Sequence, residues 1–204
     1  MKRSLEEHAA RFDEKAPEYD ADKSEEYRAT VSLVLEHASP DPDDTVLDLG
    51  TGTGVIALAL AGESDRVIGR DISEGMLAEA RSKAEGRGQE NVTFGTGRFR
   101  EPNVDGPVDV VASNFAMHHL SDAEKREAIQ VVGDLAPRKF VLGDVMFFGA
   151  PDPAEPFYSP EVDDPSTVGH LADAMTEAGF AITAVERVRE QVGVIACEYR
   201  GEGE

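Results

Sequence analysis

The segment VLDLGTGTG, residues 46–54, restricts the fold of this chain more than any other stretch. A short apolar strand runs directly into three glycines separated by threonines, and good helix formers follow in VIALALAG. A strand that ends in a glycine turn and continues as a helix opens a β-α-β unit, in which the turn backbone can approach a ligand closely. The segment therefore predicts an α/β fold with a binding site at the end of this strand.

The rest of the chain alternates between short β-rich runs and helical segments. Strands are predicted at 45–49, 66–71, 91–97, 107–114 and 139–144, and helices at 24–38, 51–62, 73–86, 121–135 and 166–180. Two further β-rich runs, 181–190 and 191–200, follow one another closely enough for a hairpin. This alternation predicts a doubly wound, mostly parallel, seven-stranded Rossmann-like sheet with an antiparallel terminal strand.

Local signals set the expected limits of these helices. Helix 24–38 has Ser24 as a plausible N-cap, and helix 121–135 opens with Ser121 and Glu124 at capping-box spacing. Helix 73–86 is expected to begin at Ser73 and to end at Gly86. For helix 24–38, the 3.6-residue period predicts a face made of Tyr27, Val31, Val34 and Leu35.

A chain of 204 residues is long enough for one α/β domain, and no repeat or long linker divides it. We expect a single domain over residues 1–204, with its core in residues 24–204. Residues 1–23 are expected to act as a lid, and residues 145–165 as a loop on the substrate side. The aromatic residues of that loop either form a wall of the substrate pocket or are buried against the sheet; they are Phe147, Phe148, Phe157 and Tyr158.

The charge balance is strongly acidic, with 41 Asp and Glu against 20 Lys and Arg and a net charge of −21. We interpret this as halophilic adaptation, because at molar salt the repulsion is screened and the carboxylates keep the protein hydrated. An acidic interaction face is the alternative, but the carboxylates are scattered rather than grouped in blocks. No basic patch for binding DNA is visible in the sequence.

Cysteine content and hydropathy indicate the compartment. The single cysteine, Cys197, excludes an intramolecular disulfide framework and is interpreted as core filler. No segment approaches the roughly 20 apolar residues of a membrane span. We therefore expect a soluble, cytoplasmic protein without membrane association.

Two kinds of ligand compete for the glycine turn: a dinucleotide, or another nucleoside-like molecule. The dinucleotide fingerprint G-x-G-x-x-G would need a glycine where this sequence has Val55. Asp48 would repel a pyrophosphate and attract a cation, although it can equally be a buried carboxylate bonded to N–H groups of the turn. Asp71, at the end of the second strand, is placed to accept hydrogen bonds from two ribose hydroxyls. A ligand with a ribose, a positive group and no phosphate fits both carboxylates.

These segments resemble those of the class I S-adenosylmethionine-dependent methyltransferases, of the type related to quinone-biosynthesis and small-molecule methyltransferases. VLDLGTGTG is similar to the first motif of that family, VIGRDISEGML to its second, and DVVASNFAMHHL to its fourth-strand motif. FDEKAPEYD resembles the usual N-terminal lead-in, and together these matches cover about residues 12–145. The resemblance implies S-adenosyl-L-methionine as the cofactor, with its methionine part against the glycines.

The resemblance also implies which residues bind the methionine part. The backbone of Gly50, Thr51 and Gly52 would approach it, with Asp48 nearby. Asn114, at the end of the fourth strand, would line the same side of the pocket. Tyr19 is a weaker match and would close over the cofactor from the N-terminal segment.

On the nucleoside side, the resemblance implies that Asp71 holds the ribose hydroxyls. Ile72 and Met76 would pack on the adenine ring, although Met76 fits the helix core equally well. The backbone N–H of Phe99 would meet the adenine edge. Gly54 is expected to serve only the close packing of helix and strand.

One position departs from the family pattern. The family's third-strand motif carries an aspartate that accepts a hydrogen bond from the adenine amino group, but here the sequence is TGRF, with Arg98 in that place. Arginine has no acceptor, so its side chain would either stack on the ring or turn away to solvent. We therefore expect weakened binding of adenine.

Catalytic residues are less well marked. His118 and His119 follow the fourth strand, where an imidazole can deprotonate an acceptor, but adjacent histidines are common in the resembling family without catalytic duty, which favours loop packing. Asp144 is expected to end the fifth strand, where it is either catalytic or caps the next segment. No C-x-x-C, H-E-x-x-H or clustered carboxylate–histidine spacing indicates a metal site.

The function that the sequence favours is methyl transfer from S-adenosylmethionine to a small-molecule acceptor. A non-catalytic or regulatory protein that keeps the fold is the alternative. An RNA-modifying methyltransferase stays open, because family resemblance does not fix the substrate class. An NAD-dependent oxidoreductase is disfavoured by Asp48 and Val55.

Overall fold

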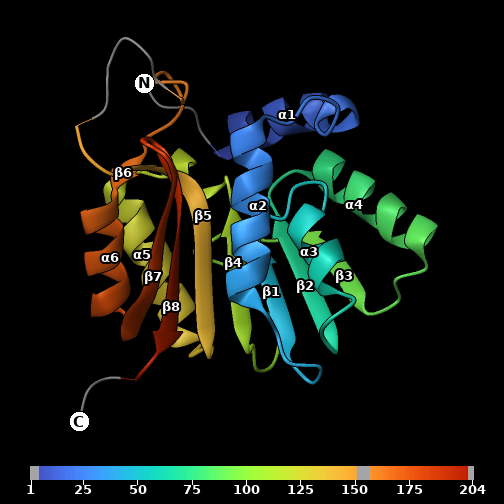
Figure 1. Ribbon diagram of the computed structural model, residues 1–204. Helices are drawn as coiled ribbons and strands as arrows, with labels where there is room; N and C mark the ends of the chain where they lie inside the picture. Colours follow the sequence, from blue (N-terminus) through green and yellow to red (C-terminus); the bar gives the residue numbers. More distant parts are fainter. Residues whose placement is uncertain (1–4, 151–156, 202–204) are drawn as a thin grey trace.

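The fold is built on a sheet whose seven main strands follow the order β3-β2-β1-β4-β5-β8-β7 (Figure 1). The computed structural model describes residues 5–150 and 157–201, so residues 1–4 of the expected lid and 151–156 of the expected loop lie outside the described residues. The strands are β1 Thr45–Leu49, β2 Arg66–Asp71, β3 Val92–Thr96, β4 Val110–Asn114, β5 Lys139–Phe147, β7 Phe180–Arg189 and β8 Val192–Tyr199.

The strand directions agree with the sequence prediction. Strands β1 to β5 are parallel to one another, whereas β8 is antiparallel to both β5 and β7. β7 and β8 form the expected hairpin. A two-residue strand, β6 Ser166–Thr167, pairs with β5 and was not predicted. The doubly wound, mostly parallel sheet with an antiparallel terminal strand is therefore confirmed.

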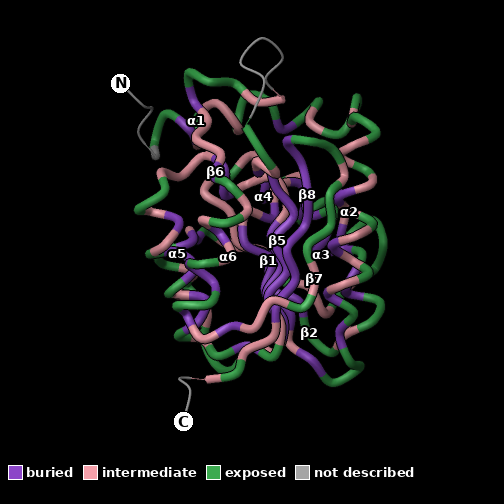
Figure 2. Tube along the Cα trace, turned by 60° about the vertical axis from the view of Figure 1, so that its left-hand side comes forward, coloured by how far each residue is buried: buried purple, intermediate pink, exposed green. Residues whose placement is uncertain are grey.

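Helices cover both faces of this sheet. α2 and α3 pack on one face and α5 and α6 on the other, while α4 lies along β3 and β2, and α1 rests against α4 (Figure 1). Figure 2 shows the buried residues gathered in the central strands, with exposed residues on the outer helices. The helical elements are α1 Leu5–Lys15, η1 Ala16–Glu18, α2 Glu25–Ala38, α3 Val55–Leu60, α4 Glu74–Arg87, η2 Met117–His119, α5 Asp122–Asp134 and α6 Val168–Glu177.

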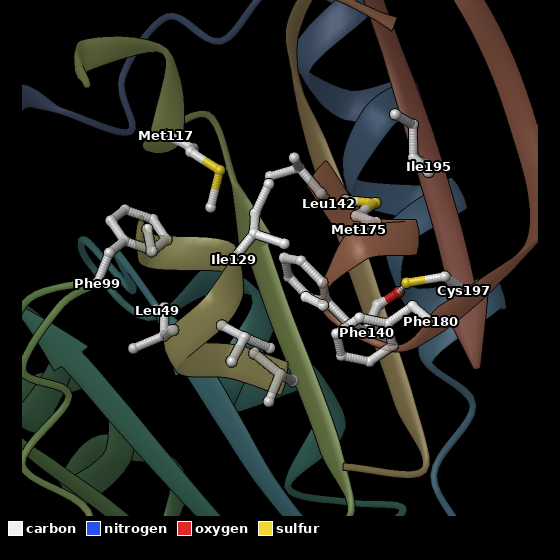
Figure 3. Close-up of a cluster of buried hydrophobic side chains, with 14 of the residues drawn as sticks. Leu49, Phe99, Met117, Ile129, Phe140, Leu142, Met175, Phe180, Ile195 and Cys197 are labelled. Atoms are coloured by element: carbon white, nitrogen blue, oxygen red, sulfur yellow. Dashed lines mark hydrogen bonds between the residues drawn. The ribbon is translucent and has the colours of Figure 1, made fainter. Parts of the chain in front are cut away.

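The larger apolar cluster fills the space between the sheet and the α5–α6 layer (Figure 3). Phe140 and Phe180 pack in a tilted arrangement with their ring centroids 5.9 Å apart. Cys197 belongs to this cluster, as its interpretation as core filler predicted. The cluster continues to Phe99 and Met117, so the core directly supports two segments that border the candidate site.

The buried face of α2 differs from the predicted one. Of the four predicted residues only Val34 is fully buried, and it is accompanied by Thr30 and Ala38. These three lie at i, i+4 and i+8, the stripe that packs on β4, β5 and β8. Tyr27 is instead turned toward a cavity beyond the strand ends.

Two element boundaries that the sequence assigned to named residues also need correction, and one helix was missed. α4 ends at Arg87, because Gly88, with φ +64°, forms the left-handed C-cap that was assigned to Gly86. β5 continues past Asp144 to Phe147, so Asp144 neither ends the strand nor caps the segment after it. The helix α1 was not predicted within the N-terminal segment.

Within the described residues, no helix combines the length and apolar character that a membrane crossing requires.

Candidate cofactor and substrate cavity

A cavity of about 310 Å³ opens beyond the carboxyl ends of β1, β2 and β4. Its volume falls in the range of small-molecule sites, and its position is the one at which open α/β sheets bind ligands. Every residue that the family resemblance assigned to the cofactor contributes to its lining. These residues are Tyr19, Asp48, Gly50, Thr51, Gly52, Asp71, Ile72, Met76, Arg98, Phe99 and Asn114.

The glycine turn presents bare backbone to this cavity. Gly50 and Gly52 have φ values of +72° and +52°, a region that residues with a Cβ adopt at a cost. A Cβ on Gly50 would lie 2.3 Å from the Cβ of Ala116. The amide groups of Gly50 and Thr51 both donate to the carbonyl oxygen of Arg70, which fastens the turn to the end of β2. The turn is therefore held in place without any side chain between it and a ligand.

Asp48 lies under this turn and is only 1% exposed. Its Oδ2 accepts hydrogen bonds from the Thr51 hydroxyl at 2.7 Å and from the amide of Ala57 at 3.1 Å. Burial raises the pKa of Asp48 to about 7, although these two donors favour the ionised form. The carboxylate thus shapes the turn, as one of the two interpretations held, and it also borders the cavity.

Asp71 links the glycine turn after β1 to Ser73 at the start of α4. Its Oδ2 accepts from the amide of Gly52 at 2.8 Å, and its Oδ1 accepts from the amide of Ser73 at 3.0 Å. Burial raises the pKa of this carboxyl above its usual range. Because each carboxylate oxygen has two lone pairs, both oxygens keep acceptor capacity for a ligand in the cavity.

The end of the cavity assigned to adenine is bordered by Ile72, Met76 and Phe99. Met76 is 2% exposed, so it serves the core as well as the cavity wall. The Arg98 guanidinium binds Glu101 with N–O distances of 2.6 and 3.0 Å. Arg98 is thus paired with a carboxylate three residues further along the chain. Its side chain offers no acceptor in place of the missing aspartate.

Asn114 and two aromatic residues form the wall at the end of β4. Both side-chain amide atoms of Asn114 are buried, and the amide interacts with the hydroxyl of Tyr27. Phe115 follows with φ +51° and stacks on Tyr27 at 5.4 Å between ring centroids. Strained residues of this kind concentrate at binding sites.

The N-terminal segment covers the cavity. α1 contributes His8 and Phe12 to the lining, and Tyr19 follows from the turn after η1. The segment is fastened by Asp13, whose Oδ1 accepts from the Ser73 hydroxyl at 2.6 Å and from the amide of Gly75 at 2.8 Å. Burial, with the nearby carboxylates of Asp71 and Asp20, raises the pKa of Tyr19 to about 12. Its hydroxyl therefore stays protonated at neutral pH.

His118 and Asp144 lie behind the cavity wall rather than in it. Asp144 Oδ1 lies 2.5 Å from His118 Nδ1, and its Oδ2 accepts from the backbone amide of His118 at 2.9 Å. Burial alone would lower the pKa of His118, but the Asp144 carboxylate outweighs burial and raises it. This pair holds η2 against β5, which agrees with the expected packing role.

His119 is the one member of the predicted catalytic set that borders the cavity. Its Nδ1 lies 2.8 Å from Asp163 Oδ1, which comes from 44 residues further along the chain. Burial lowers the pKa of His119 below its usual value. The sequence predicted no metal site because it shows no characteristic spacing, yet the fold groups His118, His119 and Asp163 closely enough to hold an ion.

Of the two alternatives for the aromatic residues of the loop 145–165, the pocket wall does not hold for this cavity. None of its four aromatic side chains borders the cavity. Phe147 and Tyr158 pack on each other at 5.7 Å, and Phe148 packs against the main core cluster. Burial, the alternative left open by the sequence, is therefore correct for Phe148, and the cavity wall comes instead from α1 and Phe115.

Sequence reasoning missed several residues of the cavity. His8 and Phe12 lie in the helix that was not predicted, and an amphipathic pattern in LEEHAARFDEK was the available signal. Tyr27 was assigned to the helix core, and only the fold shows that it lies past the strand ends. Phe115 directly follows the predicted Asn114 and had no motif of its own.

Comparison with known proteins identifies the family. A family model described as a methyltransferase domain matches residues 46–136, the segment that carries the glycine turn, Asp71 and η2. An uncharacterized methyltransferase of Geobacillus sp. (strain WCH70) is 33% identical over 149 residues, which make up 70% of this chain and 66% of that protein. The chain therefore carries a segment that matches the methyltransferase-domain family. It spans 42–66% of the length of five curated relatives that it matches.

Solved structures agree with this assignment at the level of the fold. Magnesium protoporphyrin IX methyltransferase of Synechocystis PCC 6803, with bound S-adenosylhomocysteine, has a TM-score of 0.76 at 20% identity and covers 94% of this chain and 95% of that one. The cyclase SpnF has a TM-score of 0.79 at 17% identity and covers 97% of both chains. At these identities the likeness concerns the fold alone.

Proposed function

We propose that this chain is an enzyme that transfers the methyl group of S-adenosylmethionine to a small-molecule acceptor. The observation that carries the proposal is the cavity at the strand ends, in which backbone glycines, Asp48 and Asp71 meet. S-adenosylmethionine, when bound, supplies a methyl group on a positively charged sulfur. A site that combines bare backbone with two carboxylates suits a sulfonium nucleoside better than a dinucleotide, whose pyrophosphate the carboxylates would repel.

The described residues fit the cofactor in three ways. Asp71 offers acceptors to a ribose, and Ile72 with Met76 offers an apolar face to a purine ring. The buried side-chain amide of Asn114, which borders the cavity beside Tyr27, can offer a donor and an acceptor to an amino acid group. The turn at Gly50 permits contact that a side chain would prevent.

Catalysis in this site rests mainly on positioning. Displacement at a sulfonium needs the acceptor close to the methyl group and in line with the leaving sulfur, in a cavity from which water is excluded. Phe12, Tyr19, Tyr27 and Phe115 supply apolar walls for that purpose. The aromatic lining favours an acceptor with an apolar body over an RNA strand.

The N-terminal segment 1–23 has a defined task in this proposal, because α1 and Tyr19 close the cavity. A chain that lacks residues 1–23 is expected to keep its fold and to lose most of its turnover, since water then enters the site. Transfer of a labelled methyl group to a panel of hydroxyl, amine and thiol acceptors, at high salt, tests both points. Turnover that is unchanged by the deletion would contradict the role of the lid.

A second candidate function follows from the fold comparison. The structural neighbour SpnF is described as a cyclase, so this fold also serves chemistry other than methyl transfer. A non-catalytic or regulatory binding protein belongs to the same group of alternatives. Binding of S-adenosylhomocysteine without turnover of any acceptor in the panel would favour this group.

A further inference from the structure

A cluster of three metal-ligand side chains lies beside the cavity and has no role in the proposed cofactor site. His118 and His119 come from η2, and Asp163 comes from the segment before β6. One ligand atom of each residue lies within 4.8 Å of those of the other two. Of the three residues only His119 lines the cavity, so an ion in this cluster would lie at the edge of the space that holds an acceptor.

The distances between ligand atoms in the cluster lie on either side of the separation of two ligands of one metal ion. His119 Nδ1 is 2.8 Å from Asp163 Oδ1, and His118 Nε2 is 4.0 Å from the same oxygen. The second distance is too long for a hydrogen bond. Two ligands of one tetrahedral zinc ion, at ordinary bond lengths, are separated by about 3.3 Å, which lies between these two values.

His118 is oriented as a metal-binding histidine usually is. Its Nδ1 faces the carboxylate of Asp144, which can only accept, so the neutral ring carries its proton on Nδ1 and its lone pair on Nε2. The same carboxylate accepts from the backbone amides of His118 and Val145, which fixes its position. A carboxylate that holds the far nitrogen of a ligating histidine is the common outer partner in protein metal sites.

The carboxylate of Asp163 is held in place through one oxygen, and its other oxygen faces the histidines. Its Oδ2 accepts from the backbone amide of Ser159 at 2.7 Å. The next residue, Asp164, donates its amide to the carbonyl oxygen of His118 at 2.7 Å, which fastens this segment to η2. Oδ1 therefore points at both histidines, and an ion bound there would replace the proton that Asp163 shares with His119.

We propose that His118, His119 and Asp163 bind a first-row transition-metal dication of the Zn²⁺ type, with a coordination position open to the cavity. Two imidazoles and one carboxylate favour such an ion over Mg²⁺ or Ca²⁺, which prefer oxygen ligands. Three protein ligands with an open fourth position are typical of catalytic rather than structural zinc sites.

The open position gives the site a role in acceptor binding, and this role rests on the proposed function. An acceptor hydroxyl or thiol that coordinates the ion loses its proton to solvent water more readily and becomes a better nucleophile. The acceptors expected from this site are therefore those whose oxygen or sulfur can bind a dication.

Calorimetric titration of the EDTA-treated full chain with Zn²⁺ tests the site. The titration is done at about 1 M salt, because the net charge of −21 would otherwise collect cations over the whole surface. One Zn²⁺ per chain is expected. His119→Ala and Asp163→Ala should each weaken binding by at least about 100-fold, and Asp144→Asn by about 10- to 100-fold, as loss of an outer partner does.

His170→Ala is the matched control, since His170 lies on α6 and is not part of the cluster. It should leave Zn²⁺ binding unchanged. Co²⁺ added in place of Zn²⁺ gives a visible spectrum that reports its ligand geometry, which His119→Ala should abolish and His170→Ala should preserve. Circular dichroism of each variant separates loss of the site from loss of the fold.

Equal Zn²⁺ affinity in the wild type and in His119→Ala, or no binding by the wild type, would overturn the proposal. Titration of the same samples with S-adenosylhomocysteine separates this outcome from failure of the proposed function. A chain that binds S-adenosylhomocysteine but not Zn²⁺ refutes only the metal site. A chain that binds Zn²⁺ but not S-adenosylhomocysteine refutes the proposed function and leaves the metal site standing.

Discussion

The two sides of the cavity are built in different ways. On the β1–β2 side, the backbone amides of the glycine turn donate to the end of the neighbouring strand, Gly50 to the carbonyl oxygen of Arg70 and Gly52 to the carboxylate of Asp71. On the opposite side, His119 is held by Asp163, which is 44 residues distant and contacts it only through its side chain. A side held by backbone and by neighbouring strands leaves a linear motif in the sequence, whereas a side assembled from distant side chains does not. We also expect the β1–β2 side of the cavity to tolerate fewer changes in its backbone.

The largest effect is expected for Gly50→Ala. The new Cβ would meet Ala116 at 2.3 Å, and the residue would keep a φ of +72°. Strain and overpacking together should lower the free energy of unfolding by about 2–5 kcal/mol. Urea unfolding measures this loss.

Gly106→Ala is the matched control for that change. Gly106 has a φ of +86°, but a Cβ there would meet nothing within 4 Å. It should cost only the conformational strain, about 1–2 kcal/mol. Equal losses in the two variants would show that the close approach at the glycine turn has no energetic weight.

A pH-dependent effect is expected at Asp48. Burial raises its pKa from 3.8 to about 7, so the folded protein keeps this proton where the unfolded chain has released it. The contribution to stability is complete below about pH 4 and is lost as the pH rises to about 7, an effect on the order of 2–4 kcal/mol. Asp48→Asn, measured by unfolding at several pH values, should remove this slope. The exposed Asp43→Asn should leave it unchanged, and a slope that persists in Asp48→Asn would exclude Asp48 as its source.

Asp71→Asn sharpens the same comparison on the ligand. The amide keeps the volume of the carboxylate but loses the charge and one acceptor that a ribose would use. Affinity for S-adenosylhomocysteine, measured by calorimetry, should fall by about 10- to 100-fold, the value of a hydrogen bond to a charged group. Asp43→Asn again serves as the control. Unchanged affinity in Asp71→Asn would show that Asp71 does not bind the ribose.

The smallest effect is expected for Arg98→Asp. The variant restores an acceptor at the adenine end, but it also places a negative charge beside Glu101, the present partner of Arg98. Affinity for S-adenosylhomocysteine should rise, by about 3- to 10-fold at most. Arg87→Asp, at the distant end of α4, controls for the change of net charge. Binding that is no tighter than in the wild type would show that the lost acceptor does not limit adenine recognition.

Much of the fold could be predicted because its signals are local. Alternating β-rich and helical segments fixed the sheet class, and Ser24, Ser73 and Ser121 cap the helices that they were expected to begin. The eleven residues predicted to bind the cofactor all border the cavity, mainly because parallel strands bring their carboxyl ends to one edge. The halophilic interpretation of the charge stays a prediction.

The rest depends on contacts that no local pattern encodes. Tyr27 was assigned to the same face of helix α2 as Val34, because the helical period shows which residues share a face. The period does not show which end of the helix extends beyond the sheet. The pairing of His119 with Asp163 arises only when the chain before β6 returns to η2. For the same reason the four loop aromatics were left with two alternatives, and Phe148 turned out to be partly buried against the core.

The central claim is that the cavity at the glycine turn selects an S-adenosyl nucleoside without phosphate over a dinucleotide. Calorimetric titration of the purified chain at high salt with S-adenosylhomocysteine and, separately, with NAD tests it most directly. One S-adenosylhomocysteine per chain and no binding of NAD is the predicted result. Binding of NAD without S-adenosylhomocysteine, or of neither ligand, would contradict it.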